Sequence, residues 1–191
     1  MMTVAPRLTR KEESDAELVV AVAAGDLRAL GELFDRHEPA LRRYLRRMGI
    51  PRADVDDLVQ ATFLEITRAA PSFDARQAGR SWIFGVASIM LRRHRHILRR
   101  AAARISAWVM PEAEVEGTPA ELFERAETER RFARAFAALS AKKREAFVLV
   151  TLEGLSGEEA AQALGVPVNT IWTRLHHARL ELRAAIDVEE S

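Results

Sequence analysis

Apolar residues recur at intervals of three and four along most of this chain, which predicts an all-α protein. We expect the second helix to be kinked or split by Pro39. No segment shows the strict apolar and polar alternation of a strand. The helices are expected at residues 15–24, 26–48, 54–70, 81–104, 120–139, 141–152, 157–164 and 168–186.

Breaks in this pattern divide the chain into two small helical domains. Residues 1–14 are polar and aperiodic, and we expect them to be disordered. Residues 15–104 form the first domain and residues 120–191 the second. Between them, residues 105–119 end in a stretch with three glutamates, Gly117 and Pro119, which predicts a flexible acidic linker.

The last two predicted helices have the form of a helix-turn-helix. Ser156 and Glu159 can build a capping box, and Gly165 and Pro167 suit the turn and the next helix start. The second helix buries one apolar stripe and presents polar side chains opposite, so it can enter a DNA major groove. The alternative is an ordinary helical hairpin with a solvated face. The polar positions are Asn169, Thr170, Thr173, Arg174 and His177.

Composition excludes several classes of chemistry. The chain has no cysteine, which removes disulfides, iron–sulfur clusters, thiolate catalysis and cysteine-containing zinc sites. A net charge of +1 argues against nonspecific coating of nucleic acid. The N-terminus has no signal-type apolar core and no stretch could span a bilayer, so we expect a cytoplasmic protein without membrane insertion.

Although the net charge of the chain is close to zero, one predicted helix is strongly basic. Residues 75–111 contain no acid, and Arg92, Arg95 and Arg99 follow Ser88 along one face. Aromatic side chains stand at the start of this helix and before it. Phosphate contact with base stacking is one interpretation. A solvated arginine face over a core that holds the aromatic rings is the other.

Acidic side chains gather near the start of the predicted helix at 54–70. Asp54, Asp56 and Asp57 suit the helix dipole, and this alone could explain them. With Gln60 on the same side, they could equally form a docking surface for a basic partner.

Together these segments resemble a bacterial sigma factor of the extracytoplasmic-function group. Residues 56–64 are similar to the family's region-two helix, which docks on the clamp helices of RNA polymerase. Phe73-Asp74 and residues 82–87 resemble the loop and helix that melt and read the minus-ten element. Residues 166–179 resemble the region-four helix that reads the minus-thirty-five element. The resemblance covers residues 15–186.

The resemblance implies three sets of binding residues and no catalytic ones. The residues implied to bind polymerase are Asp56, Asp57 and Gln60. Contact with the minus-ten element falls on Phe73, Trp82, Ser88, Ile89, Arg92, Arg93, Arg95 and Arg99. Contact with the minus-thirty-five element falls on Asn169, Thr170, Trp172, Thr173, Arg174 and His177. Several of these positions, among them Ser88 and Trp172, differ from the residues common in the family, so its promoter preference does not transfer.

The expected partners are core RNA polymerase, promoter DNA and an anti-sigma factor, with no cofactor or metal. A stand-alone helix-turn-helix regulator is the alternative, and a helical enzyme is a third interpretation. An enzyme would need convergent groups, but His94 and His96 lie on different helix faces. Under the resemblance, the acidic linker is either a plain tether or a segment that follows the path of nascent RNA.

Overall fold

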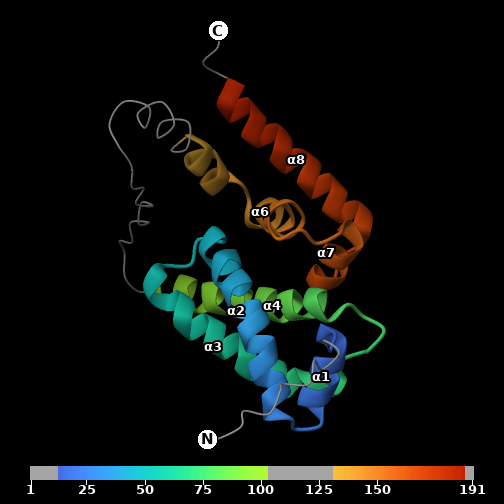
Figure 1. Ribbon diagram of the computed structural model, residues 1–191. Coiled ribbons are helices and arrows are strands. Elements are labelled where there is room, and N and C mark those ends of the chain that lie inside the picture. The colour runs from blue at the N-terminus through green and yellow to red at the C-terminus, as the bar shows by residue number, and fades with distance from the viewer. Residues whose placement is uncertain (1–12, 103–130, 188–191) are drawn as a thin grey trace, which may run out of the picture.

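The computed structural model describes residues 13–102 and 131–187, and all regular secondary structure in these ranges is helical (Figure 1). The first half contains α1 (Asp15–Ala23), α2 (Leu27–Arg47), α3 (Arg52–Ala69), the 3₁₀ turn η1 (Ala70–Ser72) and α4 (Gly79–Ala102). In the second half residues 131–138 are helical. They are followed by α6 (Ala141–Phe147), the π-helical segment η2 (Val148–Leu152), α7 (Gly157–Leu164) and α8 (Val168–Asp187). The all-helical prediction is confirmed for these residues.

The first two helices begin where their capping residues stand. Ser14 accepts a hydrogen bond from the backbone N–H of Glu17, whose carboxylate accepts in return from the N–H of Ser14. Asp26 caps α2 by accepting from the N–H of Arg28 at 2.9 Å. Gly25, at φ 90°, makes the turn between the helices. Ser14 thus belongs to the first helix cap, whereas residues 1–12 lie outside the described residues.

Helix α2 is continuous through Pro39, so of the predicted kink or split the split does not occur. Proline removes one backbone donor and crowds the preceding turn. Leu33 and Leu41, on either side of Pro39, are fully buried. Packing along this face holds the helix together across the missing hydrogen bond, as tertiary burial commonly does.

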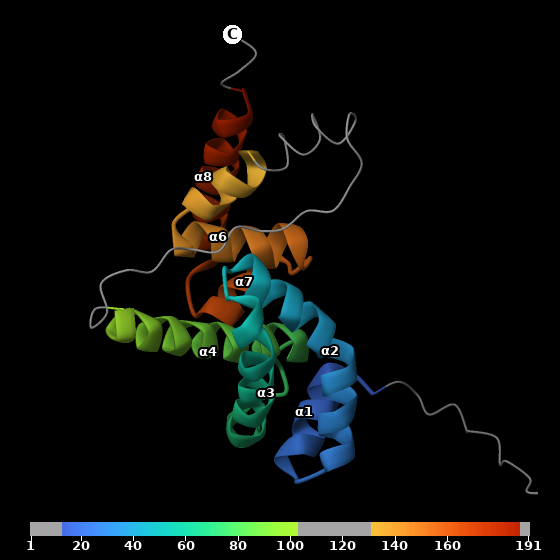
Figure 2. The ribbon, with the colours of Figure 1, turned by 90° about the vertical axis from the view of Figure 1, so that its left-hand side faces the viewer.

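Helix α4 lies between α1 and α3 on one side and α7 of the helix-turn-helix on the other (Figures 1 and 2). Its buried side chains Ile83, Phe84 and Leu91 join a core that also contains Tyr44 and Ile66. The same core continues into the second half. A smaller cluster joins residues 131–138, α6 and α8 and consists of Leu139, Phe147, Leu175, Ala178 and Leu182. The predicted linker at 105–119 lies outside the described residues.

Candidate functional site

The acidic end of α3 presents an exposed face with one apolar member. Asp57 and Gln60 are exposed, and Leu64, one turn further on, is 59% exposed. These spacings of three and four place all three side chains on one side of the helix. Leu58 and Phe63 lie in the core on the other side. Leu64 was not among the binding residues predicted from the sequence, although its spacing from Gln60 could have identified it.

Asp56 belongs to the same end of α3 but has a partner. Its carboxylate accepts a hydrogen bond from the guanidinium of Arg42 on α2, which also binds Glu38 at 2.5 Å. The Asp56 side chain is still 62% exposed. Asp56 is therefore accessible to a partner, but it would share its charge with Arg42.

The arginines of α4 pair with other elements. Arg92 lies 3.5 Å from a carboxylate oxygen of Glu145 on α6, and Arg93 lies 3.1 Å from Glu65 on α3. Arg95 donates to the backbone carbonyl of Met48. Acidic partners are absent along α4 itself, but they come from helices distant in sequence. The structure describes no side chain for Arg99.

Ser88 is the predicted minus-ten residue that the fold buries completely. Its hydroxyl lies 2.8 Å from the hydroxyl of Tyr44, which donates to Glu145 at 3.1 Å. Burial, together with the nearby Glu145 carboxylate, raises the pKa of Tyr44 well above 10.0. In this arrangement Ser88 serves the contact between the two halves of the chain.

The remaining predicted minus-ten residues of the first half differ in exposure. Ile89 is 42% exposed on α4. Phe73 and Trp82 are half-buried, and their ring centroids lie 5.1 Å apart in a tilted arrangement. Both rings pack against the core. One interpretation places the aromatic rings in the core, and the other has them stack on a base. Phe73 and Trp82 pack on the core and are also partly exposed, so this pair is compatible with both.

The helix-turn-helix has the expected caps and turn. Ser156 and Glu159 form the capping box of α7, and Gly165 ends that helix in the left-handed region at φ 64°. Ile171, Leu175 and Ala178 are buried, which fixes the rotation of α8. The predicted minus-thirty-five residues consequently point outward, with Asn169, Trp172, Thr173 and His177 exposed and Thr170 and Arg174 half-buried.

Two local contacts shape the outer face of α8. The Thr173 hydroxyl donates to the Asn169 carbonyl at 2.9 Å, which leaves its oxygen free to accept. Trp172 rests on Gly157, where an added Cβ would lie 2.2 Å from Cζ2 of the indole. The absence of a side chain at Gly157 thus determines where Trp172 lies. This role of Gly157 was not predictable from the sequence, because only the fold brings it beneath the ring.

The described residues contain no group of three or more His, Asp or Glu side chains that could hold a metal ion. His94 lies 3.3 Å from Asp54, and the adjacent His176 and His177 rings contact each other. Within residues 13–102 and 131–187, no helix is long and apolar enough to cross a bilayer.

A helix with acidic residues near its start, an arginine-rich helix and a helix-turn-helix, in this order, define a helical DNA-binding protein. Comparison with known families agrees with this class. Residues 33–104 match the Sigma-70 region 2 family, and residues 129–182 match Sigma-70, region 4. The chain belongs to the extracytoplasmic-function group of RNA polymerase sigma factors, which are non-enzymatic polymerase subunits.

Relatives align over nearly the whole chain. RNA polymerase sigma factor CnrH of Cupriavidus metallidurans is 32% identical over 186 residues, covering 93% of this chain and 97% of CnrH. The sigma factor SigM of Mycobacterium tuberculosis is 36% identical over 174 residues, covering 91% of this chain and 85% of SigM.

Solved structures share the fold. CnrH in complex with the cytosolic domain of CnrY superposes with a TM-score of 0.67 at 31% identity, covering 93% of this chain and 99% of that one. The sigma factor RpoE of Bartonella quintana, in complex with the anti-sigma factor NepR, gives a TM-score of 0.69 at 23% identity, covering 83% and 97% of the two chains. The second likeness concerns the fold alone.

Proposed function

We propose that this sigma factor docks on core RNA polymerase through α3 and reads promoter DNA through α4 and α8. The observation that carries the proposal is the exposed face of Asp57, Gln60 and Leu64, which lies opposite the buried side of α3. A helix needs neither acids nor an exposed leucine there to complete this core. Such a face suits a basic partner surface with an apolar centre.

The test of docking is a double substitution, Asp57→Lys with Gln60→Ala. It should weaken association with core polymerase and leave the helical content and melting temperature unchanged, because both side chains are exposed. Arg68→Ala, at a 76% exposed side chain on the same helix, is the matched control. Unchanged affinity of the folded double variant would remove α3 from the docking surface.

A stand-alone helix-turn-helix regulator is the competing function at the level of mechanism. Such a protein would bind its operator without polymerase, whereas this chain carries a docking face in its first half. Capture of core polymerase by the tagged chain supports the sigma assignment. Specific operator binding by a chain that captures no polymerase would favour the regulator.

On α8, Asn169 and Arg174 carry donors suited to base edges, and Thr170 and Thr173 can reach phosphates or bases. Arg92 and Arg93 of α4 form ion pairs, whereas Arg174 forms none within the part of the chain that the structure describes. Arg174 can therefore bind DNA without first breaking an ion pair. We propose α8 as the reader of the minus-thirty-five element.

An anti-sigma factor is a further proposed partner, and the cytoplasm the proposed location, since polymerase works there. The similar CnrH and RpoE structures are complexes with CnrY and with the anti-sigma factor NepR. Affinity purification of the full chain from its own cells tests this partner. Recovery of polymerase alone, under conditions in which the factor is inactive, would argue against it.

A further inference from the structure

The indole ring of Trp172 on α8 rests on the neighbouring helix α7 through one of its faces. An added Cβ on Gly157, the first residue of α7, would lie 2.2 Å from Cζ2 of the indole, 2.7 Å from Cε2 and 2.9 Å from Cη2. A point so close to one atom and to both of its ring neighbours lies above the plane of the ring, because a point beyond the edge would be farther from those neighbours. Gly157 therefore covers one face of the indole, and the side chain is still 46% exposed.

The start of α7, which supports this ring, is itself fixed. The backbone N–H of Glu159 donates to the Ser156 hydroxyl at 3.1 Å, and the Glu159 carboxylate accepts from the N–H of Ser156 at 2.8 Å. Ile171, the residue before Trp172, is fully buried and fixes the rotation of α8. A tryptophan side chain also has only two rotatable bonds to order. The indole therefore takes its position before DNA arrives, which lowers the entropy cost of a contact.

The uncovered part of the ring has no partner in the described part of the chain, where no aromatic ring or guanidinium stacks on Trp172. Its neighbours on the outer face, Asn169 and Thr173, are polar and exposed. Leu180, an exposed apolar side chain of the same helix, lies about 12 Å further along the axis. Near the start of α8, Trp172 is thus a large apolar surface among hydrogen-bonding side chains.

Such a surface matches one chemical group of the major groove. Base edges there present hydrogen-bond donors and acceptors and a single kind of apolar group, the C5-methyl of thymine. A recognition helix reaches base edges with residues near its N-terminus. Helix α8 begins at Val168, so Trp172 lies at the end that enters the groove, whereas Leu180 lies two turns beyond it.

We infer that Trp172 reads the methyl group of a thymine in the minus-thirty-five element. The inference rests on the proposed role of α8 as the reader of that element. Trp172 selects a T·A pair through apolar contact, next to the bases that Asn169 and Arg174 contact through their donors. A lysine or arginine at the same place would favour guanine, so Trp172 determines the preferred base at this position.

Removal of one methyl group from the DNA tests the inference. The probe is a minus-thirty-five duplex that the parent holoenzyme selects from random-sequence DNA. Each thymidine is replaced in turn by deoxyuridine, which lacks the C5-methyl and keeps the hydrogen-bonding edge. At one position this replacement should weaken holoenzyme binding about three- to fivefold, as expected for the burial of one methyl group. The Trp172→Ala holoenzyme should bind both forms of that position equally.

Two further variants separate a contact by the ring from a change of fold. Gly157→Ala keeps the indole but displaces it from α7, so the preference for thymidine over deoxyuridine should fall below about twofold. Leu180→Ala removes a similarly exposed apolar side chain from the same helix and should keep the full preference. Circular dichroism and thermal melts establish that all three variants are folded.

The outcomes distinguish the inference from the proposed function. A selected duplex without a methyl-dependent thymidine, or a Trp172→Ala holoenzyme that retains the methyl preference, would overturn the inference. A loss of affinity in Trp172→Ala that is the same for both forms of every probe would identify a sugar contact and would also overturn it. The proposed function survives these results as long as scrambling the minus-thirty-five element weakens holoenzyme binding. Binding that ignores scrambling would refute α8 as the reader, and the inference with it.

Discussion

The two proposed promoter readers, α4 and α8, differ in what surrounds their polar side chains. On α4, Arg92, Arg93 and Arg95 all have partners within the protein, and Ser88 is buried. On α8, the outer face from Asn169 to His177 is largely exposed. The more basic helix is thus the less accessible one.

This difference follows from the position of the helices. Helix α4 runs through the middle of the molecule and packs on α1, α3 and α7, so acidic side chains from several elements reach it (Figure 1). Helix α8 packs through one side on α6 and α7. Charge along a sequence therefore indicates which helix could bind DNA, whereas tertiary packing decides which one is available.

The largest expected effect comes from the core that supports α4. Phe84 is fully buried, meets Tyr44 edge-on at 5.6 Å and lies beneath Arg80. Phe84→Ala should lower the free energy of unfolding by about 3–5 kcal/mol, through lost burial and the cavity left behind. Urea denaturation measures it. Ile97→Ala, at a 64% exposed site on the same helix, should cost less than about 0.5 kcal/mol. If Phe84→Ala and Ile97→Ala lower the free energy of unfolding equally, the Phe84 side chain does not stabilise the core.

Next in size is the loss of a base contact on α8. Arg174→Ala should weaken binding of the matched minus-thirty-five duplex by about 1–3 kcal/mol, and binding of a scrambled duplex much less. Competition binding with both duplexes, using the holoenzyme, measures the difference. Arg93→Ala is the comparison on α4, measured with a matched minus-ten probe, and its effect there should be smaller because Arg93 must first leave Glu65. Equal losses on matched and scrambled DNA would make Arg174 a phosphate anchor.

Most of the fold was predictable from the sequence because caps and apolar spacing are local. Ser156, Gly165 and the stripe through Ile171 placed the helix-turn-helix within a residue or so of its observed bounds. The partners of the α4 arginines were not predictable. Glu65, Glu145 and Met48 lie far from them in sequence, and only the packed fold brings them close. The burial of Ser88 and the seat of Trp172 on Gly157 escaped prediction for the same reason.

The packing of Trp172 on Gly157 can be tested directly, because it positions a side chain on the outer face of α8. Gly157→Ala should push the indole off α7, since the new Cβ would overlap the ring. The ring is 46% exposed and can swing outward, so we expect a stability loss of only about 1 kcal/mol. Tryptophan fluorescence should change on this substitution. A Trp172→Phe background should abolish that change, and a change that persists there would come from another tryptophan.

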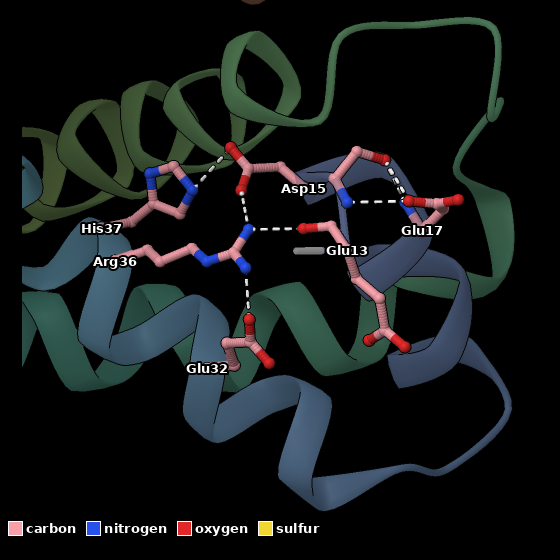
Figure 3. A network of polar contacts seen from close by, with 7 residues as sticks. Glu13, Asp15, Glu17, Glu32, Arg36 and His37 are labelled. Atoms are coloured by element: carbon pink, nitrogen blue, oxygen red, sulfur yellow. Dashed lines mark hydrogen bonds and ion pairs between the residues drawn. The ribbon is translucent and has the colours of Figure 1, made fainter. Parts of the chain in front are cut away.

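The smallest effect is expected at the polar network that anchors α1 (Figure 3). Asp15 lies 2.8 Å from Nε2 of His37 and 3.3 Å from Arg36, which also donates to the Glu13 carbonyl at 2.7 Å and binds Glu32. Asp15 also adjoins Gly79, where an added Cβ would lie 2.5 Å from the backbone of α1. The network therefore holds α1 against α2, beside the start of α4, and does not involve α8.

The close contact with Nε2 of His37, above all, lowers the pKa of Asp15 from 3.8. A lowered folded-state pKa means that the charged Asp15 stabilises the fold above about pH 3.8, and that this contribution is lost as the pH falls through the lower folded value. Asp15→Asn should cost about 0.5–1 kcal/mol near neutral pH, because the pair is partly exposed to solvent. Thermal melts of parent and variant should converge as the pH falls below 3.8. A difference that stays constant well below that pH would show that Asp15 acts through packing rather than charge. Since α8 lies outside the network, minus-thirty-five binding by Asp15→Asn should match that of the parent.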